Sequence, residues 1–188
     1  MYSSSGYLKP FTQIQFSNYK TNYFQRILNE INSKSKEHIL GVNEEDYQKY
    51  LTKKYTLEEL DIDLNSESYK TPSISGSNYN FEIMYNFTGS IELFSIKPNP
   101  YTMSSYQVNV DENNNKVSFE LVMQEQNAKK FQLLKNKLFN RAFCNINHVN
   151  ENIRKLNLIV PEFIVNTFHD RKKHFLKEND FFSEISQN

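Results

Sequence analysis

Six cationic side chains in the last third of this chain are the residues best suited by type and spacing to a chemical role. Three are consecutive, Arg171, Lys172 and Lys173, and three others precede them: Arg141, Arg154 and Lys155. Clustered lysines and arginines neutralise phosphate groups and release their counterions. The set therefore predicts a surface for a polyanion, and an ordinary solvated helix face stays open as the alternative.

Residues that could hold a metal ion are few and poorly spaced. His169 and His174 are five residues apart, which puts them about 140° apart around a helix and disfavours a shared metal ion. Asp61 and Asp63 fall on one face of an expected strand with Glu59 nearby, and paired carboxylates can hold a cation. Because a solvated strand face explains the same pattern, we expect no metal.

Motifs that mark catalytic or nucleotide-binding sites are missing from the sequence. The glycines are too far apart to form a phosphate-binding loop, since they stand at positions 6, 41, 76 and 89. Asp170-Arg171-Lys172 has the Asp-x-Lys pattern of some metal-dependent nucleases, but it falls in an expected helix and not on a strand. No Gly-x-Ser-x-Gly sequence marks a nucleophilic serine. We predict a protein that is not an enzyme and binds no cofactor.

The spacing of apolar residues changes near residue 124, from alternation to steps of three and four. Alternation predicts strands, and the clearest pair is a hairpin across the Asx-rich turn 111–115. A turn or bulge is expected at Thr88-Gly89, and a mobile loop is expected over 65–80. The predicted strands are 57–64, 81–87, 91–98, 106–110 and 117–123.

Helices are predicted at both ends of the chain. Two short ones are expected near the N-terminus, after Asn22 and Asn43 as capping residues. One helix of about 30 residues is expected from Phe131 to Leu156, and Pro161 is expected to open a second as its first-turn proline. The sequence thus predicts an α+β fold, in which an antiparallel, strand-rich centre is packed by a C-terminal hairpin of long helices.

Length and composition predict a single domain over residues 1–188. The 15 Phe and 12 Tyr predict an aromatic core, and the formal net charge is zero. Cys144 is the only cysteine, so no disulfide forms within the chain and a reducing cytoplasm is expected. The N-terminus does not look like a signal peptide, and no stretch approaches the roughly 20 apolar residues of a membrane span.

Residues 80–185 resemble an uncharacterised module found at the N-terminus of bacterial proteins in defence gene neighbourhoods. The segment 86–100 is similar to that module's Phe-x-Gly-Asp-x-x-Leu-Phe-x-x-x-Pro-Ser pattern, with Ser90 where Asp is usual. Residues 150–185 resemble its proline-opened final helix, with Arg171-Lys172-Lys173 at the place of an Ala-Arg-Lys motif. In relatives, the module is joined to restriction-endonuclease-like or other effector domains.

The resemblance implies a non-catalytic interaction or sensing subunit of a bacterial antiviral system, acting with a separately encoded effector protein. The residues expected to contact that partner are the cations named above and the turn at Thr88 and Gly89. The alternative is a nucleic-acid-binding protein that uses the basic C-terminal helical half. Nucleic acid as a further partner and a homo-oligomeric state are left open, and no membrane is expected.

Overall fold

The computed structural model describes residues 5–70, 72–103 and 106–186. Contacts within the chain divide it into two compact units. The sheet unit comprises Met1–Phe16 and Glu58–Ile153, and the helical unit comprises Ser17–Leu57 and Arg154–Asn188. The α+β class, the antiparallel sheet, the short helices near the N-terminus and the long C-terminal helix are confirmed. The single domain predicted for residues 1–188 stays a prediction.

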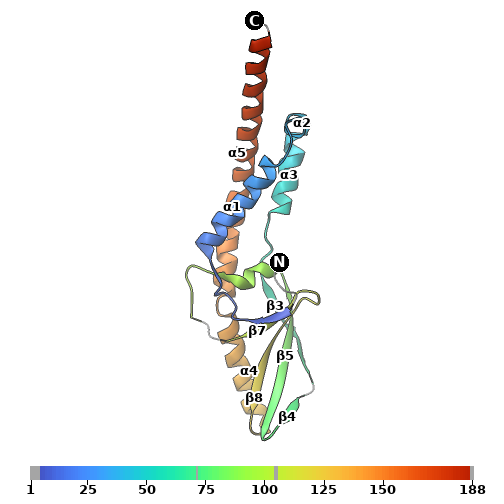
Figure 1. Ribbon diagram of the computed structural model, residues 1–188. Coiled ribbons are helices and arrows are strands. Elements are labelled where there is room, and N and C mark those ends of the chain that lie inside the picture. The colour runs from blue at the N-terminus through green and yellow to red at the C-terminus, as the bar shows by residue number, and fades with distance from the viewer. Residues whose placement is uncertain (1–4, 71, 104–105, 187–188) are drawn as a thin grey trace. The chain divides into compact units, whose positions relative to one another are not determined.

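The sheet unit is built on an antiparallel sheet in which the order of strands is β1-β7-β8-β5-β3, with β4 also paired to β5 (Figure 1). Its strands are β1 (Ser5–Leu8), β3 (Asp61–Tyr69), β4 (Ser73–Ser75), β5 (Asn78–Thr88), β7 (Val108–Asp111) and β8 (Lys116–Met123). The predicted hairpin is confirmed, because β7 and β8 pair with Val110 opposite Val117. A separate parallel pair joins β2 (Ile14–Gln15) to β6 (Ile96–Lys97).

Two sequence predictions for this unit are wrong. The expected loop 65–80 instead continues β3 and forms β4, which turns back into β5 at Gly76 with a φ of 59°. Backbone pairing with β5 needs no apolar side chains, so composition did not reveal it. The expected strand 91–98 is a 3-10 helix, η1 (Ile91–Ser95), followed by β6, because neighbouring Leu93 and Phe94 are both buried.

The helix α4 (Ala128–Phe143) covers one face of the sheet, as Figure 1 shows beside β8 and β5. Its inner face is aromatic. The Phe131 ring centroid lies 5.6 Å from that of Tyr69 and 4.8 Å from that of Phe81, and Phe139 packs against Tyr85 at 5.1 Å. The predicted aromatic core is found in buried rings of both units, among them Phe94 and Phe119 in the sheet unit and Phe168 in the helical unit.

The helical unit packs α1 (Phe16–Asn32), α2 (Lys36–Gly41) and α3 (Glu44–Lys54) with the C-terminal part of α5 (Ile146–Ser186). The predicted cap is confirmed, since Asn43 accepts a hydrogen bond from the amide of Asp46. The predicted cap at Asn22 is wrong, because α1 begins six residues earlier, at Phe16, and Asn22 lies inside it. Phe24 packs against Phe163 of α5 at a ring-centroid distance of 4.5 Å.

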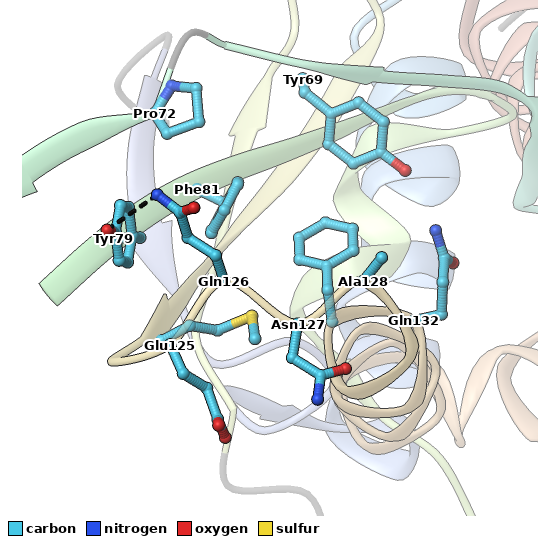
Figure 2. A pocket seen from close by; sticks show the side chains of 11 residues that line it. Tyr69, Pro72, Tyr79, Phe81, Glu125, Gln126, Asn127, Ala128 and Gln132 are labelled. Atoms are coloured by element: carbon cyan, nitrogen blue, oxygen red, sulfur yellow. Dashed lines mark hydrogen bonds between the residues drawn. The ribbon is translucent and has the colours of Figure 1, made fainter.

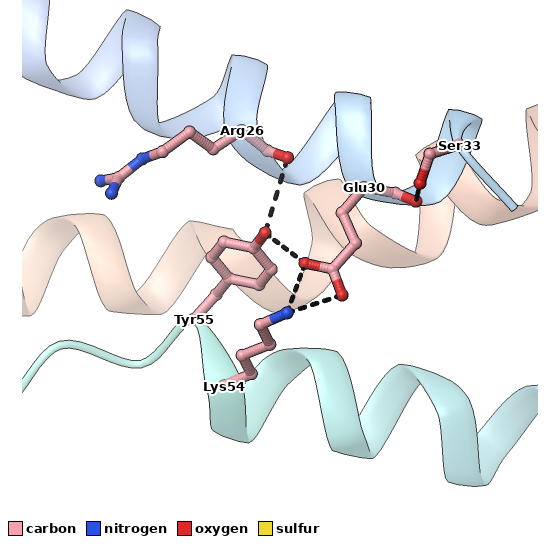
Figure 3. Close-up of polar contacts among 5 residues, drawn as sticks. All are labelled: Arg26, Glu30, Ser33, Lys54 and Tyr55. Carbon is pink, nitrogen blue, oxygen red and sulfur yellow. Dashed lines mark hydrogen bonds and ion pairs between the residues drawn. The ribbon is translucent and has the colours of Figure 1, made fainter.

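A polar cluster joins α1 to the end of α3 (Figure 3). Lys54 lies 2.7 and 2.8 Å from the two Glu30 carboxylate oxygens, and the Tyr55 hydroxyl donates to the same carboxylate at 2.5 Å. Partial burial acts to raise the pKa of Glu30, but the hydrogen bonds from Lys54 and Tyr55 outweigh it and lower that pKa. The carboxylate therefore stays charged inside the unit.

Two helices, α4 and α5, follow the sheet, but the predicted position of the break between them is wrong, and the folding back of one on the other as a hairpin stays a prediction. The break lies at Cys144–Asn145, and α5 runs through Pro161 without ending. Leu156, Val160 and Ile164 keep the buried stripe continuous across the proline. Burial of that stripe outweighs the one backbone hydrogen bond that a proline removes.

Asparagines at the start of α5 hold distant backbone in place. The Asn150 side chain accepts from the Leu60 amide at 2.9 Å and donates to the Leu60 carbonyl at 2.8 Å. The same pair of hydrogen bonds, one accepted and one donated by the asparagine side chain, joins Asn145 to Thr102, Asn152 to Asn99 and Asn157 to Leu57. Asn145, fully buried, thereby fixes the break between the two helices.

Candidate functional site

The helix α4 turns a row of cations and amides toward solvent, which we call the α4 face. Its exposed residues are Lys129, Lys130, Gln132, Leu133, Asn136, Lys137, Asn140 and Arg141. Lys130, Lys137 and Arg141 are seven and four residues apart, so they form one stripe along the helix. Because α4 contains no aspartate or glutamate, no acid within the helix offsets these charges.

The cations of the α4 face have few acidic neighbours. Lys130 pairs with Glu125, which precedes the helix, whereas Lys129 and Lys137 form no ion pair with any residue that the structure describes. Lys137 and Arg141 stand a helical turn apart with like charge, an arrangement that destabilises a helix by a few tenths of a kcal/mol.

A shallow groove of about 550 Å³ runs beside the C-terminal half of the α4 face. Its described lining contains cations, amides and apolar side chains but no acid: Thr102, Met103, Leu133, Asn136, Lys137, Asn140, Arg141 and Cys144. Burial raises the pKa of the Cys144 thiol, so that side chain stays neutral at physiological pH. The groove is therefore electropositive and open.

The cluster predicted at Arg171, Lys172 and Lys173 is largely occupied by contacts within the helical unit. Arg171 donates to the backbone carbonyl of Asn32 at 3.3 Å, and its guanidinium lies 4.2 Å from the Phe175 ring centroid. Lys172 donates to Glu44 at 2.9 Å. That hydrogen bond lowers the pKa of Glu44, which also contacts His169. Lys173 is the exposed member of the three.

The other predicted cations divide between the two helices. Arg141 belongs to the α4 face in the sheet unit, and Arg154 and Lys155 are exposed on α5 in the helical unit. Lys155 and Arg171 are about 24 Å apart along that helix. Acids alternate with the cations of α5, at Glu162, Asp170, Glu178, Asp180 and Glu184. Binding of a partner through these residues stays a prediction.

The turn predicted at Thr88 and Gly89 is packed against its own unit. Gly89 has a φ of 99°, and a Cβ there would lie 2.0 Å from the Glu59 carbonyl oxygen. Two hydrogen bonds join Ser90 to Glu58. The Ser90 amide donates to the Glu58 carbonyl, and the Glu58 amide donates to the Ser90 hydroxyl, both at 3.0 Å. Thr88 alone is exposed, and its role in recognition stays a prediction.

A buried ion pair that the sequence did not suggest lies under α4. The Lys135 ammonium sits 2.7 and 2.6 Å from the two Glu67 oxygens, and the lysine side chain is only 9% exposed. The hydroxyls of Tyr69 and Tyr85 also donate to Glu67. Burial, and then the hydrogen bond to Glu67, raise the pKa of Tyr85. The only clue in the sequence is that Lys135 falls four residues after Phe131, on the apolar face.

A second cavity of about 550 Å³, which we call the aromatic pocket, opens at the N-terminal end of α4 (Figure 2). It is lined by Tyr69, Pro72, Tyr79, Phe81, Met123, Glu125, Gln126, Asn127, Ala128, Phe131 and Gln132. Tyr79 is held by a hydrogen bond from Gln126 at 2.9 Å, drawn in Figure 2. The sequence did not predict this pocket, because residues 65–80 were expected to form a loop. That segment instead forms strands, which supply the Tyr69 and Tyr79 rings.

Residues considered for metal binding or catalysis do not gather. Within residues 5–70, 72–103 and 106–186, no group of three histidine, cysteine, aspartate or glutamate side chains is placed to hold a metal ion. Asp61 and Asp63 are exposed along β3, and Asp63 accepts a hydrogen bond from the Asn65 amide. Asp170 is exposed on α5.

No protein-family model, curated protein or solved structure matches this chain. Among the helices of the described residues, none has the length and apolar character needed to span a bilayer. The site must therefore be interpreted from its own chemistry.

Proposed function

We propose that this protein is a non-catalytic nucleic-acid-binding protein and that the α4 face is its interface. The single observation that carries the proposal is the row of exposed cations on a helix without an acid. Lysines and arginines in such a row contact phosphates and release counterions, and asparagine amides add hydrogen bonds to phosphate and sugar. The electropositive groove beside Lys137 and Arg141 extends that surface.

The interactions of the cations support this choice over the cluster on α5. A cation already paired with a carboxylate must give up that pair before it can neutralise a phosphate, as Lys172 would give up Glu44. Lys129 and Lys137 have no such partner among the described residues, so they contribute their full charge.

The test is a binding titration by fluorescence anisotropy, with labelled single-stranded and duplex DNA and RNA at low salt. The variant Lys129→Gln with Lys137→Gln should bind about tenfold more weakly than the unaltered protein, because two phosphates are no longer neutralised. The matched control, Lys173→Gln with Lys177→Gln, removes the same charge from exposed positions on α5 and should bind normally. No binding by the unaltered protein at low salt, or equal weakening in both variants, would exclude the proposal.

A role beside a separately encoded effector in antiviral defence is the second proposal, and it is favoured by exposed apolar residues at the end of α5. Phe181 and Ile185 are 58% and 56% exposed and lie one turn apart, and Leu176 is 47% exposed. Apolar residues grouped on a helix end suit a protein partner. Co-expression with the proteins encoded by adjacent genes should give a stable complex that Phe181→Ser with Ile185→Ser abolishes. Normal complex formation by that variant would exclude this surface.

A further inference from the structure

The aromatic pocket lies at the same end of α4 as Lys129 and Lys130, so it adjoins the proposed nucleic-acid interface. Gln132 belongs to both features, since it is part of the α4 face and lines the pocket. Lys129 and Arg141, at the two ends of the α4 face, are about 18 Å apart along the helix, which is the length of several nucleotides.

The rings of the pocket form a wall for a flat ligand. The ring of Phe131 is tilted by 59° to Tyr69 and by 58° to Phe81, at centroid distances of 5.6 and 4.8 Å. Tyr69 is 43% exposed, so part of its ring is open to a ligand. A cavity of about 550 Å³ has room for a nucleobase, and every base can stack on an aromatic face.

The pocket is also lined by amide side chains, which can form hydrogen bonds with a base but not with an aliphatic ligand. The Gln132 amide makes no hydrogen bond with any residue that the structure describes, and it lies at the pocket edge in Figure 2. An amide offers a donor and an acceptor together, which matches the paired groups on the edge of a base. A lipid chain has no donor or acceptor that could pair with those groups.

The charges around the pocket are compatible with a phosphate backbone. Glu125 lines the pocket, but its charge is matched by Lys130, and Glu67 behind Tyr69 is matched by Lys135. Lys129 in the first turn of α4 is exposed and forms no ion pair with any described residue. The net local charge therefore attracts an anion.

We infer that the aromatic pocket binds one unstacked base of a single-stranded nucleic acid, while the cations of the α4 face contact the adjoining backbone. This inference rests on the proposed function and adds strand specificity to it. Bases inside a duplex are stacked on their neighbours and do not reach such a pocket, so single strands are the preferred ligand.

The experiment compares a labelled single strand of mixed sequence with the duplex of the same sequence. The unaltered protein should bind the single strand at least about tenfold more tightly. Tyr69→Leu and, separately, Phe131→Leu should each weaken single-strand binding by about tenfold and leave duplex binding unchanged, because each removes a ring but keeps an apolar side chain. Tyr69→Phe, which keeps the ring and removes only the hydrogen bond to Glu67, should bind normally.

Tyr50→Leu is the matched control, since Tyr50 is 55% exposed on α3 in the helical unit and should not affect binding. Circular dichroism of each variant verifies that it is folded. Equal affinity for both strand states, or normal single-strand binding by folded Tyr69→Leu and Phe131→Leu, would overturn the pocket inference while leaving the α4 interface intact. Failure of the unaltered protein to bind either ligand would instead overturn the proposed function.

Discussion

The helices α4 and α5 are both rich in lysine and arginine, and they differ in what those cations contact. On α5, Lys172 is paired with Glu44, and Arg171 contacts the Asn32 carbonyl and the Phe175 ring. Glu178, an acid of α5, is in turn paired with Lys36 of α2 at 3.1 Å. On α4, Lys135 is buried in an ion pair and Lys130 pairs with Glu125, whereas the outward Lys129 and Lys137 form no ion pair with any residue that the structure describes. The neighbours of a cation, more than its presence, decide whether it is available to a ligand.

The largest effect on stability is expected at Gly89, a predicted site residue that is packed within the sheet unit. Gly89→Ala places a Cβ 2.0 Å from the Glu59 carbonyl oxygen at a φ of 99°. We expect the free energy of unfolding to fall by at least about 3 kcal/mol, because both the backbone strain and the overlap must be relieved. Urea unfolding followed by circular dichroism measures this decrease.

Gly76→Ala provides the matched comparison. Gly76 also has a positive φ, of 59°, but its Cβ would meet no atom within 4 Å. Only the strain of the left-handed conformation remains, so a decrease of about 1 kcal/mol is expected. Equal decreases at the two glycines would show that the close approach of Glu59 is not what requires Gly89.

The second largest effect concerns the buried cation of α4. Lys135→Met leaves the Glu67 carboxylate without its ammonium partner, and we expect the free energy of unfolding to fall by about 2 kcal/mol, moderated because Glu67 is 23% exposed. Adding Glu67→Gln removes the unpaired charge and should recover most of that stability in a double-mutant cycle. If the decreases caused by Lys135→Met alone and by Glu67→Gln alone add up to that of the double variant, the pair is not coupled and Lys135 acts only through packing.

Local signals in the sequence were sufficient for some elements and not for others. The hairpin of β7 and β8 and the Asn43 cap were predictable, because turn chemistry, alternation and a capping side chain are properties of a short window. The continuation of α5 through Pro161 was not, since burial against distant residues outweighs the local preference. The break at Asn145 depends on a bond to Thr102, a partner that no local window contains.

The candidate site shows the same division. The basic character of the helical half was readable from composition, and Arg141 was correctly located on the long helix after the sheet. The sequence did not indicate which cations pair with acids, because residues such as Glu44 and Lys172 are far apart in the chain and come together only in the folded protein. The aromatic pocket was missed for the same reason, since Tyr69 and Phe131 come from separate elements.

A smaller effect, dependent on pH, is expected from the ion pairs of α5. The hydrogen bond from Lys172 lowers the pKa of Glu44 below its ordinary 4.5, so this carboxylate stabilises the fold above about pH 4.5. That contribution disappears as the pH falls through the lowered pKa. Glu44→Gln should cost about 0.5 kcal/mol at neutral pH, and the difference from the unaltered protein should vanish in acid.

Thermal or urea unfolding at a series of pH values measures this difference. Glu45→Gln is the control, because Glu45 lies on the same helix and, among the residues that the structure describes, pairs with exposed Lys49 alone. Its effect should be smaller than that of Glu44→Gln. A difference at Glu44 that persists unchanged into acid would mean that the pair with Lys172 is not its source.

The smallest effect on stability, and the one that completes the comparison, is expected on the α4 face. Lys129→Gln with Lys137→Gln should change the free energy of unfolding by no more than about 0.5 kcal/mol, because neither lysine forms an ion pair with a described residue. The same variant should reduce the slope of log affinity against log salt by about 1.4 for a single strand, at about 0.7 for each phosphate that is no longer neutralised. The pair Lys173→Gln with Lys177→Gln on α5 should leave that slope unchanged. An identical slope in all three proteins would mean that the cations of the α4 face do not touch phosphate, even if the protein binds nucleic acid.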